Sequence, residues 1–505
     1  PKEAQVEKTI RALTIAFYSV FTIIIGYIFF ASLANSLSLL TLIILLLFIP
    51  GIYLIHRFLL KYENFLNEHY KLLLAFFIAF MLCIQIIFGF LLRFTPAFDM
   101  DAIYGGAIEW VNTGSFFSYY DYYYYFPNNL GGMSLLYIFF KLASYAGISD
   151  FFAVGMIMNS IMSVCAMLVC SLTAKKLGGA SKAVFVLVLF LLSLPFYFIA
   201  PAFYTDSLSM LFPILIIFLA LKLREADKLR QSVLLSILIG IAAAIGMLIK
   251  STVIITPIAV IICLLMNKKW AKALICCACA ASIIALSLLS FNAYFSSGHL
   301  TDTEKARVQN TPYTHWIMMG LKGTGGYNSA DYEFTRSFAD PEERNEAINA
   351  EIGRRISELG PFGIISLAGI KGSISMGNGT YALSDFLDDS PLKPCFLHSF
   401  LLYSSPHYDA YSGICCGIHL GILLLGVMSA IEKLIRAIKG AGGNTPFMAP
   451  HIAFFGIALF LLMWETSGRY ITNYIPVLFI CAASGPELLD RIIKNLNPRR
   501  KFPAQ

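Results

Sequence analysis

The chain has 505 residues, of which 58% are hydrophobic and 13% are charged, and its mean hydropathy is +0.72. This composition excludes a soluble protein of this size and predicts an all-α polytopic membrane protein. The net charge is +7, but the placement of the basic residues explains it better than an anionic partner such as nucleic acid. All cysteines except Cys395 lie in apolar stretches, so no disulfide framework is predicted.

Twelve apolar stretches are long enough to cross about 30 Å of hydrocarbon as helices. They cover residues 10–33, 37–56, 70–92, 152–174, 183–203, 206–222, 232–249, 252–267, 271–295, 411–431, 449–465 and 470–488. Several connections are only two or three residues long, so the helices that they join must be antiparallel neighbours. The first stretch has no small-residue cleavage site, and we expect it to remain as an anchor.

Lysine and arginine gather in alternate connections, and this bias indicates the orientation of a membrane protein. The basic segments are residues 2–11, 57–71, 175–182, 222–230, 268–272, 433–439 and 491–501. We therefore predict that these segments and both termini are cytoplasmic. Arg93, Lys250 and Arg469 stand at the opposite, extracytoplasmic face, where a cation needs a specific reason.

The same pattern places two long segments outside the membrane. The predicted division is three helices over residues 1–94, an outer segment with acidic residues over 95–151, a six-helix core over 152–295, a large outer segment over 296–410, and three helices with a basic tail over 411–505. In the first outer segment, Met133 to Ala146 is apolar, and we expect this piece to lie along the membrane surface.

The second outer segment contains one helix with clear signals. Asp340 is its expected N-cap and Pro341 its first residue. An apolar face follows at Ile348, Ile352, Ile356 and Leu359. A second apolar piece, Phe362 to Met376, is interrupted by glycines and carries Lys371, so we expect an interfacial helix there.

Two aspartates, Asp99 and Asp101, follow the third predicted helix directly. If a helix begins near Asp99 and continues through the glycine pair that follows, Asp101 and Glu109 share one face. Carboxylates at an outer membrane interface can take a proton from an incoming hydroxyl, or hold a sugar or a metal ion. The alternative is structural, with Asp99 as an N-cap and the other carboxylates in solvent.

Two further charged residues stand at short turns of the predicted outer face. Lys250 ends the seventh helix, where a cation suits a phosphate. The alternative is a lysine that extends to the interface and anchors its helix. Asp206 stands at the start of the sixth helix, either as a substrate ligand or as an N-cap.

The turn between the last two predicted helices reads Glu-Thr-Ser-Gly-Arg-Tyr from Glu465 to Tyr470. Arg469 can bind a phosphate through two N–H groups, while Glu465 orients it or binds a hydroxyl. The alternative is a local ion pair, because Glu465 and Arg469 are four residues apart.

His315 and Trp316 precede a glycine-rich stretch at the start of the second outer segment. Aromatic and histidine side chains can stack on sugar rings and bind hydroxyls, and the alternative is an aromatic anchor at the membrane interface. The sequence contains no zinc-protease spacing, Walker loop, nucleophile elbow or dinucleotide fingerprint, which argues against ATP-driven transport and the common soluble chemistries.

Together these features resemble the GT-C superfamily of membrane glycosyltransferases, which includes protein O-mannosyltransferases and the bacterial transferases that modify lipid A with aminoarabinose. The resemblance lies in the acids of the first outer loop, the long later outer loop and the basic residues at outer helix ends. Three motifs are similar to those of Gram-positive bacterial members: the tyrosine run into Phe126–Asn129, the unit His315–Leu321, and the turn Glu465–Tyr470.

The resemblance implies an inverting transfer of sugar from a polyprenyl-phosphate donor to a hydroxyl of a cell-surface polymer, glycolipid or protein. In such enzymes an acid of the first outer loop activates the acceptor, and here that role falls to Asp99 or Asp101. Lys250 and Arg469 would stabilise the donor phosphate. The other expected substrate contacts are Glu109, Asn128, Asn129, Asp206, His315, Trp316, Glu465 and Tyr470. No cofactor is assigned, and a divalent metal stays an open alternative.

The chain departs from the superfamily pattern in two ways. Two predicted helices precede the one that leads into the acidic loop. Met100 separates the two aspartates, which are adjacent in many relatives. The choice of base between Asp99 and Asp101 is therefore open, with Glu109 as a candidate second acid.

Two other functions fit parts of the pattern. A polymerase or ligase of lipid-linked polysaccharide also has a large outer loop, but it relies on arginine and histidine there, so its activity should survive loss of Asp101. A secondary transporter also commonly has twelve helices, but it places charges at the bilayer midplane and has repeated halves. Neither property is present in this sequence.

Overall fold

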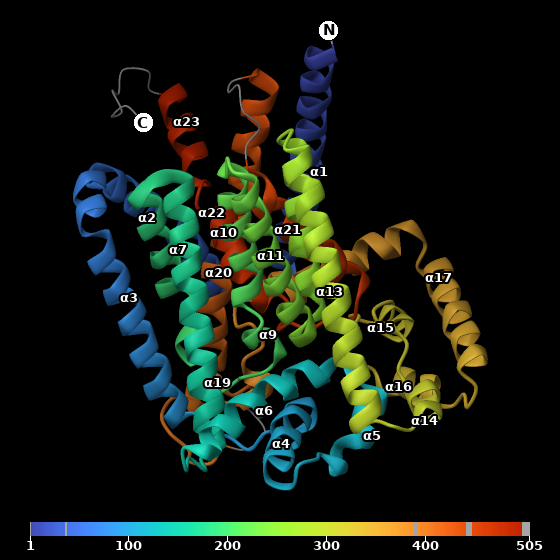
Figure 1. Ribbon diagram of the computed structural model, residues 1–505. Helices are drawn as coiled ribbons and strands as arrows, with labels where there is room; N and C mark the ends of the chain where they lie inside the picture. The colour runs from blue at the N-terminus through green and yellow to red at the C-terminus, as the bar shows by residue number, and fades with distance from the viewer. Residues whose placement is uncertain (1, 36–37, 388–390, 441–446, 497–505) are drawn as a thin grey trace.

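The computed structural model describes residues 2–35, 38–387, 391–440 and 447–496, and these residues form a helical bundle without a β-strand (Figure 1). The long bundle helices are α1 (Lys2–Asn35), α2 (Leu39–Lys61), α3 (Glu63–Leu91), α7 (Phe151–Leu192), α10 (Leu211–Glu225), α11 (Leu229–Ile249), α12 (Ile255–Met266), α13 (Trp270–Gly298), α20 (Tyr408–Lys439) and α21 (Ala449–Met463). An isolated antiparallel bridge joins Phe94 to Pro391.

The remaining elements are shorter, apart from α17. Those of the two outer segments are α4 (Phe98–Thr113), η1 (Phe117–Tyr119), α5 (Tyr120–Tyr125), η2 (Pro127–Asn129), α6 (Leu130–Tyr145), α14 (Thr303–Gln309), α15 (Tyr313–Met319), α16 (Ser329–Arg336), α17 (Pro341–Met376), α18 (Ser384–Leu387) and α19 (His398–Leu401). The others are α8 (Pro195–Phe198), α9 (Thr205–Leu208), η3 (Ser251–Ile254), η4 (Thr472–Tyr474), α22 (Ile475–Ala482) and α23 (Pro486–Leu496).

Nine helices of the described residues are long and apolar enough to cross a membrane, and two shorter apolar helices cover Ser251–Met266 and Ala449–Met463. The predicted all-α membrane protein with many spans is thus confirmed. The nine include α17, which we predicted as two pieces, a helix outside the membrane and an interfacial helix. They also count α7 as one helix, although it contains the predicted stretch 152–174 and the first half of the stretch 183–203.

Helix α7 reverses its direction at Gly178 and Gly179. Both residues have non-helical backbone angles, and φ of Gly179 is +84°, in the left-handed region that favours glycine. The hydroxyl of Ser171 donates to the carbonyl of Ala183, twelve residues later, which a straight helix would place about 18 Å away. The chain therefore makes two antiparallel passes here, as the sequence predicts, although the second ends early at Leu192.

The basic segments predicted for one face lie together at the end of the bundle where α1 begins and α23 lies (Figure 1). Arg11 donates to the carbonyl of Ala437 at 2.8 Å, and Lys182 pairs with Glu487 at 2.8 Å. Three basic residues of the predicted tail lie outside the described residues, namely Arg499, Arg500 and Lys501. Helices α4 to α6 and α14 to α16 gather at the opposite end, and α6 runs across the bundle there (Figure 1).

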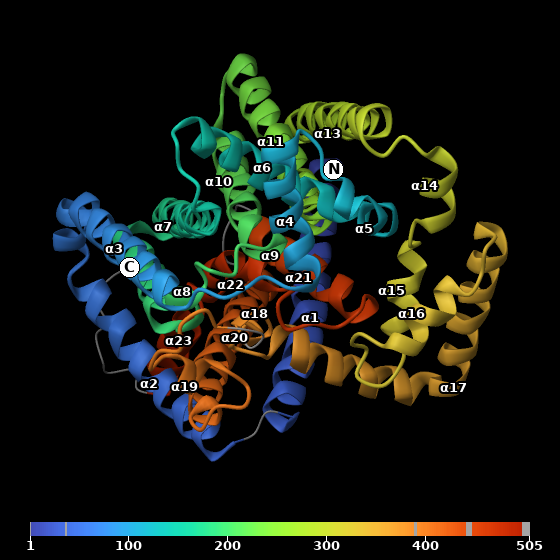
Figure 2. The ribbon, with the colours of Figure 1, turned by 90° about the horizontal axis from the view of Figure 1, so that it is seen from below.

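Helix α17 begins with the predicted cap. Oδ2 of Asp340 accepts hydrogen bonds from two backbone N–H groups of the first turn. The helix bends at Gly360, where φ is +58°, so its two halves run in different directions (Figure 2). The second half packs against α1. The predicted apolar face of the first half is only partly covered, because Ile348 is fully buried whereas Ile356 is 44% exposed.

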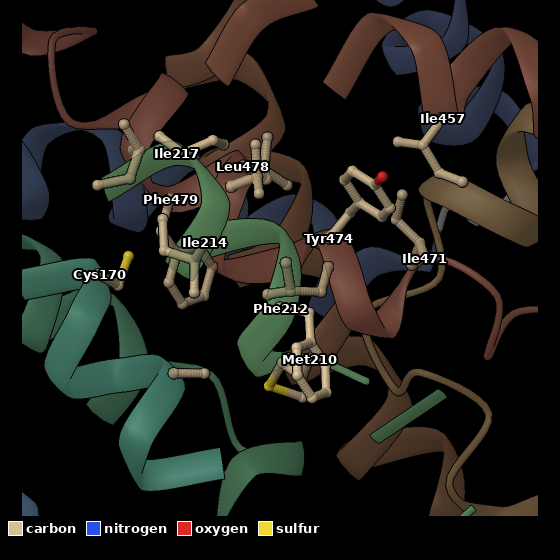
Figure 3. Packing of buried hydrophobic residues seen from close by; sticks show 14 of the residues in the cluster. Cys170, Met210, Phe212, Ile214, Ile217, Ile457, Ile471, Tyr474, Leu478 and Phe479 are labelled. Carbon is tan, nitrogen blue, oxygen red and sulfur yellow. The ribbon is translucent and has the colours of Figure 1, made fainter. Parts of the chain in front are cut away.

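A buried apolar cluster fixes the turn that precedes α22. Phe479 of α22 meets Phe190 of α7 edge to face, with ring centroids 4.8 Å apart. Tyr474, which lies in the same cluster (Figure 3), is fully buried, and its hydroxyl donates to the carbonyl of Thr252 at 2.9 Å. The turn from Glu465 to Tyr470 is therefore held next to the end of α11.

Candidate functional site

The first acid of the outer loop, Asp99, lies in the first turn of α4. Its Oδ1 accepts a hydrogen bond from the hydroxyl of Tyr122 at 2.8 Å, and its Oδ2 accepts one from Tyr204 at 3.3 Å. The N-cap of α4 is Ala97, so the interpretation of Asp99 as a cap is wrong. The Asp99 side chain is 43% exposed, so an incoming group can reach the carboxylate.

Three other predicted residues from distant parts of the chain lie near Asp99. Arg469 contacts Asp99 directly, and Asp206 and Lys250 are linked to it through Arg469. The Lys250 ammonium forms an ion pair with Oδ1 of Asp206. The Arg469 guanidinium lies 3.6 Å from Oδ2 of Asp206 through Nε, and 3.8 Å from Oδ2 of Asp99 through Nη2. These two cations and two carboxylates form one group, which we call the charged cluster.

Asp206 and Lys250, which form this ion pair, do not have the structural roles that were the alternatives for them. The N-cap of α9 is Tyr204, so the interpretation of Asp206 as a cap is wrong. The Lys250 side chain is only 15% exposed, and it turns inward to Asp206 instead of extending to the membrane interface.

A close approach of two helices holds the end of α11, which Lys250 follows. A Cβ added at Gly131 would overlap the carbonyl of Leu248, so the start of α6 packs directly beside the end of α11.

Aromatic rings surround the cations of the charged cluster. The guanidinium carbon of Arg469 lies 5.0 Å from the ring centre of Tyr204 and 5.7 Å from that of Phe386. The Lys250 ammonium lies 4.9 Å from the ring centre of Tyr470. A cation gains most from such contacts where water is excluded, so the rings both shield and hold these two charges.

The local ion pair that was the structural alternative for Glu465 and Arg469 does not form, although the structure describes both residues. Instead, the hydroxyl of Tyr470 donates to Oε2 of Glu465 at 3.1 Å. Burial raises the pKa of Glu465. The buried Lys371 ammonium interacts with this carboxylate and donates to the carbonyl of Gly320 at 2.9 Å.

A small apolar pocket opens beside the charged cluster. Its apolar wall includes Pro195, Ile199, Ala202, Leu383 and Phe386. Asp206 and Arg469 also line the pocket. An apolar surface therefore continues directly into the charged cluster.

Asp101 and Glu109 do not reach the charged cluster. Helix α4 continues through its glycine pair, as the expectation of a shared face requires, but this face contacts the segment that follows α4. The hydroxyl of Tyr119 donates to Oδ2 of Asp101 at 3.2 Å, and the backbone N–H of Ser118 donates to Oε1 of Glu109 at 3.2 Å. Of the three predicted acids on α4, Asp99 is the one that joins the charged cluster.

The two asparagines of the Pro-Asn-Asn turn have different environments. Asn129 is buried and donates to the hydroxyl of Tyr122, which itself donates to Asp99. Asn128 is exposed and donates to Oδ1 of Asn129 at 3.3 Å. Asn129 thus helps to orient the tyrosine that orients Asp99, whereas Asn128 lies one residue further out.

His315 and Trp316 lie on α15, apart from the charged cluster. His315 is buried, and its Nδ1 is 2.7 Å from the hydroxyl oxygen of Thr335. Burial lowers the pKa of His315 to about 4, so its ring is neutral at pH 7. Trp316 stacks on Trp464 with ring centroids 5.4 Å apart. This stack joins α15 to the turn that carries Glu465.

Several polar atoms of the charged cluster are buried without a hydrogen bond among the described residues. They include Nε of Arg469 and Oδ2 of Asp206, which lie 3.6 Å apart and so just beyond hydrogen-bond distance, whereas Oδ1 of Asp206 pairs with the Lys250 ammonium. The N–H at Nε of Arg469 can therefore still donate to a further oxygen. Within the same residues, no three His, Cys, Asp or Glu side chains lie close enough to hold a metal ion.

Sequence reasoning missed three residues that contact the charged cluster: Tyr122, Tyr204 and Phe386. Tyr204 stands two positions before Asp206, and Tyr122 belongs to the tyrosine run, so both had a signal in the sequence. Phe386 lies in a stretch without a motif, and only the folded chain brings it to Arg469.

Two solved structures are similar to this chain over most of its length. One is the crystal structure of ArnT from Cupriavidus metallidurans bound to undecaprenyl phosphate, with 12% identity, coverage of 85% of this chain and 81% of that chain, and a TM-score of 0.34. The other is the archaeal oligosaccharyltransferase AglB from Archaeoglobus fulgidus in complex with an inhibitory peptide and a dolichol-phosphate, with 11% identity, coverage of 86% and 53%, and a TM-score of 0.38. Both TM-scores lie below 0.5, so any assignment of function rests on the geometry of the site.

No curated protein matches the sequence. A family model described as "conserved hypothetical integral membrane protein" matches residues 9–389. The matched region includes Asp99, Asp206 and Lys250 and ends before Arg469. Since the match covers more than half of the chain, the protein belongs to this family of integral membrane proteins.

Proposed function

We propose that this chain is an inverting glycosyltransferase of the GT-C type, which moves a sugar from a polyprenyl-phosphate donor to a hydroxyl acceptor at the extracytoplasmic face. One observation carries the proposal: a carboxylate that solvent can reach, Asp99, lies 3.8 Å from the Arg469 guanidinium, beside an apolar pocket. This geometry supports the proposal, because a carboxylate that can act as a base and a cation that can bind phosphate lie next to an apolar surface.

Asp99 is the proposed base. Tyr122 and Tyr204 fix its orientation, and a carboxylate with two such bonds still has free lone pairs on its oxygens. Asp99 takes the proton of the acceptor hydroxyl while the hydroxyl oxygen attacks the anomeric carbon. The bond from that carbon to the phosphate oxygen breaks on the opposite side, so the configuration inverts.

Arg469 and Lys250 are the proposed ligands of the donor phosphate. Negative charge grows on the phosphate as the glycosidic bond breaks, and fixed cations in a partly dehydrated site stabilise that charge. Asp206 contacts both cations and therefore positions them. The phosphate oxygens would supply the hydrogen-bond partner that Nε of Arg469 lacks among the described residues.

The apolar pocket suits a polyprenyl chain. Its wall includes the uncharged side chains of Pro195, Ile199 and Ala202, against which an isoprene unit can pack. Arg469 also lines the pocket, where it can bind the phosphate at the end of the chain. Burying apolar surface stabilises a complex by about 25 cal/mol per Å², so an isoprene unit packed against this wall would add to the binding of the phosphate.

The test compares Asp99→Asn with Asp101→Asn in the purified protein, reconstituted with a radiolabelled polyprenyl-phosphate sugar and a membrane or wall extract. Asparagine has the size of aspartate but cannot take the proton, so we expect transfer by Asp99→Asn to fall about 10²–10⁴-fold. Donor binding, measured by retention of the label, should stay within a few-fold of the wild type.

Asp101→Asn is the matched control, because it makes the same change two residues away on a face that contacts Tyr119. We expect it to keep transfer within a few-fold of the wild type. If Asp99→Asn transfers sugar as fast as the wild type, Asp99 is not the base. A polymerase or ligase of lipid-linked polysaccharide would then be the better interpretation.

A further inference from the structure

A row of aromatic side chains leads from Asp99 towards the second outer segment. Tyr122, which donates to Asp99, contacts Phe126 with ring centroids 5.2 Å apart. Phe126 stacks on Tyr332 of α16 at 6.4 Å with an interplanar angle of 16°. Tyr332 contacts Tyr327 at 6.5 Å. We call Phe126, Tyr332 and Tyr327 the aromatic strip.

The aromatic strip is accessible and lies close to the proposed base. Tyr327 is 69% exposed, and Phe126 and Tyr332 are half-buried. Phe126 contacts Tyr122, which donates to Asp99, so one side chain separates the strip from the proposed base. The strip therefore begins one side chain away from Asp99 and ends in solvent.

One cation lies on the aromatic strip. The guanidinium carbon of Arg336 is 3.7 Å from the ring centre of Tyr125 and 4.3 Å from that of Tyr332. Its side chain is exposed, and no ion pair or side-chain hydrogen bond of the described residues includes it. A guanidinium stacked in this way keeps the N–H groups of its edge available for an oxygen ligand.

These groups match the surface of a carbohydrate. A sugar ring has apolar C–H faces and a rim of hydroxyls. Flat aromatic rings cover the C–H faces over a large area and lose little conformational entropy, because they rotate about only two side-chain bonds. The edge of a guanidinium donates to the hydroxyls. A lipid chain fits less well, since tyrosine hydroxyls and Arg336 make the strip polar at its edges.

We propose that the aromatic strip and Arg336 form the acceptor subsite, and that the acceptor is a carbohydrate chain whose terminal hydroxyl reaches Asp99. The role as acceptor subsite rests on the glycosyltransferase function proposed above. The binding of a carbohydrate to the strip does not, so the two can be tested separately.

The experiment measures saccharide binding without the donor. The purified full chain in detergent is titrated with linear tetrasaccharides of N-acetylglucosamine, of mannose and of glucose, and with a tetrapeptide, with binding followed by saturation-transfer NMR. We expect at least one tetrasaccharide to bind. Tyr327→Ala and Tyr332→Ala should weaken its binding about tenfold or more, because each removes one stacking ring.

Two further variants keep the result interpretable. Tyr313→Ala is the matched control, because Tyr313 is 68% exposed on the neighbouring helix α15 and takes part in no ring contact among the described residues. It should bind within twofold of the wild type. Tyr332→Phe keeps the ring and should keep the binding, whereas a loss in both Tyr332 variants with Tyr327→Ala unaffected would overturn the stacking role.

The remaining outcomes also decide the proposal. If none of the three tetrasaccharides binds, or if the strip variants bind them as the wild type does, the proposal is wrong. Binding of the tetrapeptide in their place would overturn the carbohydrate assignment. Asp99→Asn should bind the saccharide normally while losing transfer, so a failure of the strip and a failure of the proposed catalysis give different results.

Discussion

At His315, burial lowers the pKa to about 4, whereas an exposed histidine titrates near 6.5. Between these values the unfolded chain binds a proton that the folded chain does not bind. The free energy of unfolding therefore falls as the pH drops from about 6.5 towards 4. The stabilisation that comes from the neutral His315 ring is fully present above pH 6.5. At pH 5 we expect the free energy of unfolding to be ~2 kcal/mol lower for this reason.

We expect His315→Gln to remove this pH dependence, because glutamine does not titrate. Between pH 7 and pH 5 the unfolding temperature of the wild type should fall more than that of the variant, as measured by intrinsic fluorescence in detergent. His407→Gln, at an exposed histidine, is the control and should keep the wild-type slope. Equal slopes for the wild type and His315→Gln would contradict a buried neutral ring.

The members of the charged cluster could be predicted singly, but their partners could not. Lys250 and Arg469 stand out in the sequence because a cation at a short outer turn is costly unless it is used. The sequence offers local partners first, such as Glu465 for Arg469. The folded chain instead brings Asp99 and Asp206 to Arg469, because packing of helices far apart in sequence decides which charges meet.

At the level of elements, the contact between α6 and α11 depends on Gly131. A methyl group there would overlap the carbonyl of Leu248, which belongs to the backbone and cannot rotate away. Gly131→Ala must therefore push α6 and the end of α11 apart. This shift also displaces Lys250, the residue that follows α11. We expect the variant to lose about 1–3 kcal/mol of stability and to bind the donor less tightly, as measured by thermal unfolding and retention of labelled donor.

Gly353→Ala is the matched control, because Gly353 lies in α17 and an added Cβ would meet no atom within 4 Å. Alanine is the better helix former, so this variant should be as stable as the wild type or more stable by up to about 1 kcal/mol. If Gly131→Ala behaves like Gly353→Ala, the close approach of α6 to α11 is not needed for the site.

The existence of most helices could be predicted, because a span needs about twenty apolar residues whatever its neighbours are. The reversal inside α7 was also predictable, since it combines Gly178 and Gly179 with lysines on the preceding turn. The course of α17 was harder. Its N-cap at Asp340 is a local signal, whereas the exposure of Ile356 depends on what packs against the helix.

For the whole molecule, the sequence predicts that the basic end of the bundle is cytoplasmic, and the proposed chemistry needs the opposite end to be extracytoplasmic. The basis is the cost of moving clustered lysine and arginine across the membrane. Two exposed side chains mark the two ends of the bundle. Tyr313 lies in the second outer segment, and Lys269 lies in the basic connection between α12 and α13.

Cysteine labelling in intact cells that express the protein tests this orientation. In a Cys395→Ser background, a membrane-impermeant maleimide should label Tyr313→Cys in intact cells and Lys269→Cys only after the cells are permeabilised. The background protein alone gives the signal of the remaining native thiols. Labelling of Lys269→Cys but not Tyr313→Cys in intact cells would put the charged cluster on the cytoplasmic side. Asp99 would then face acceptors inside the cell, and transfer to a cell-surface glycan would be excluded.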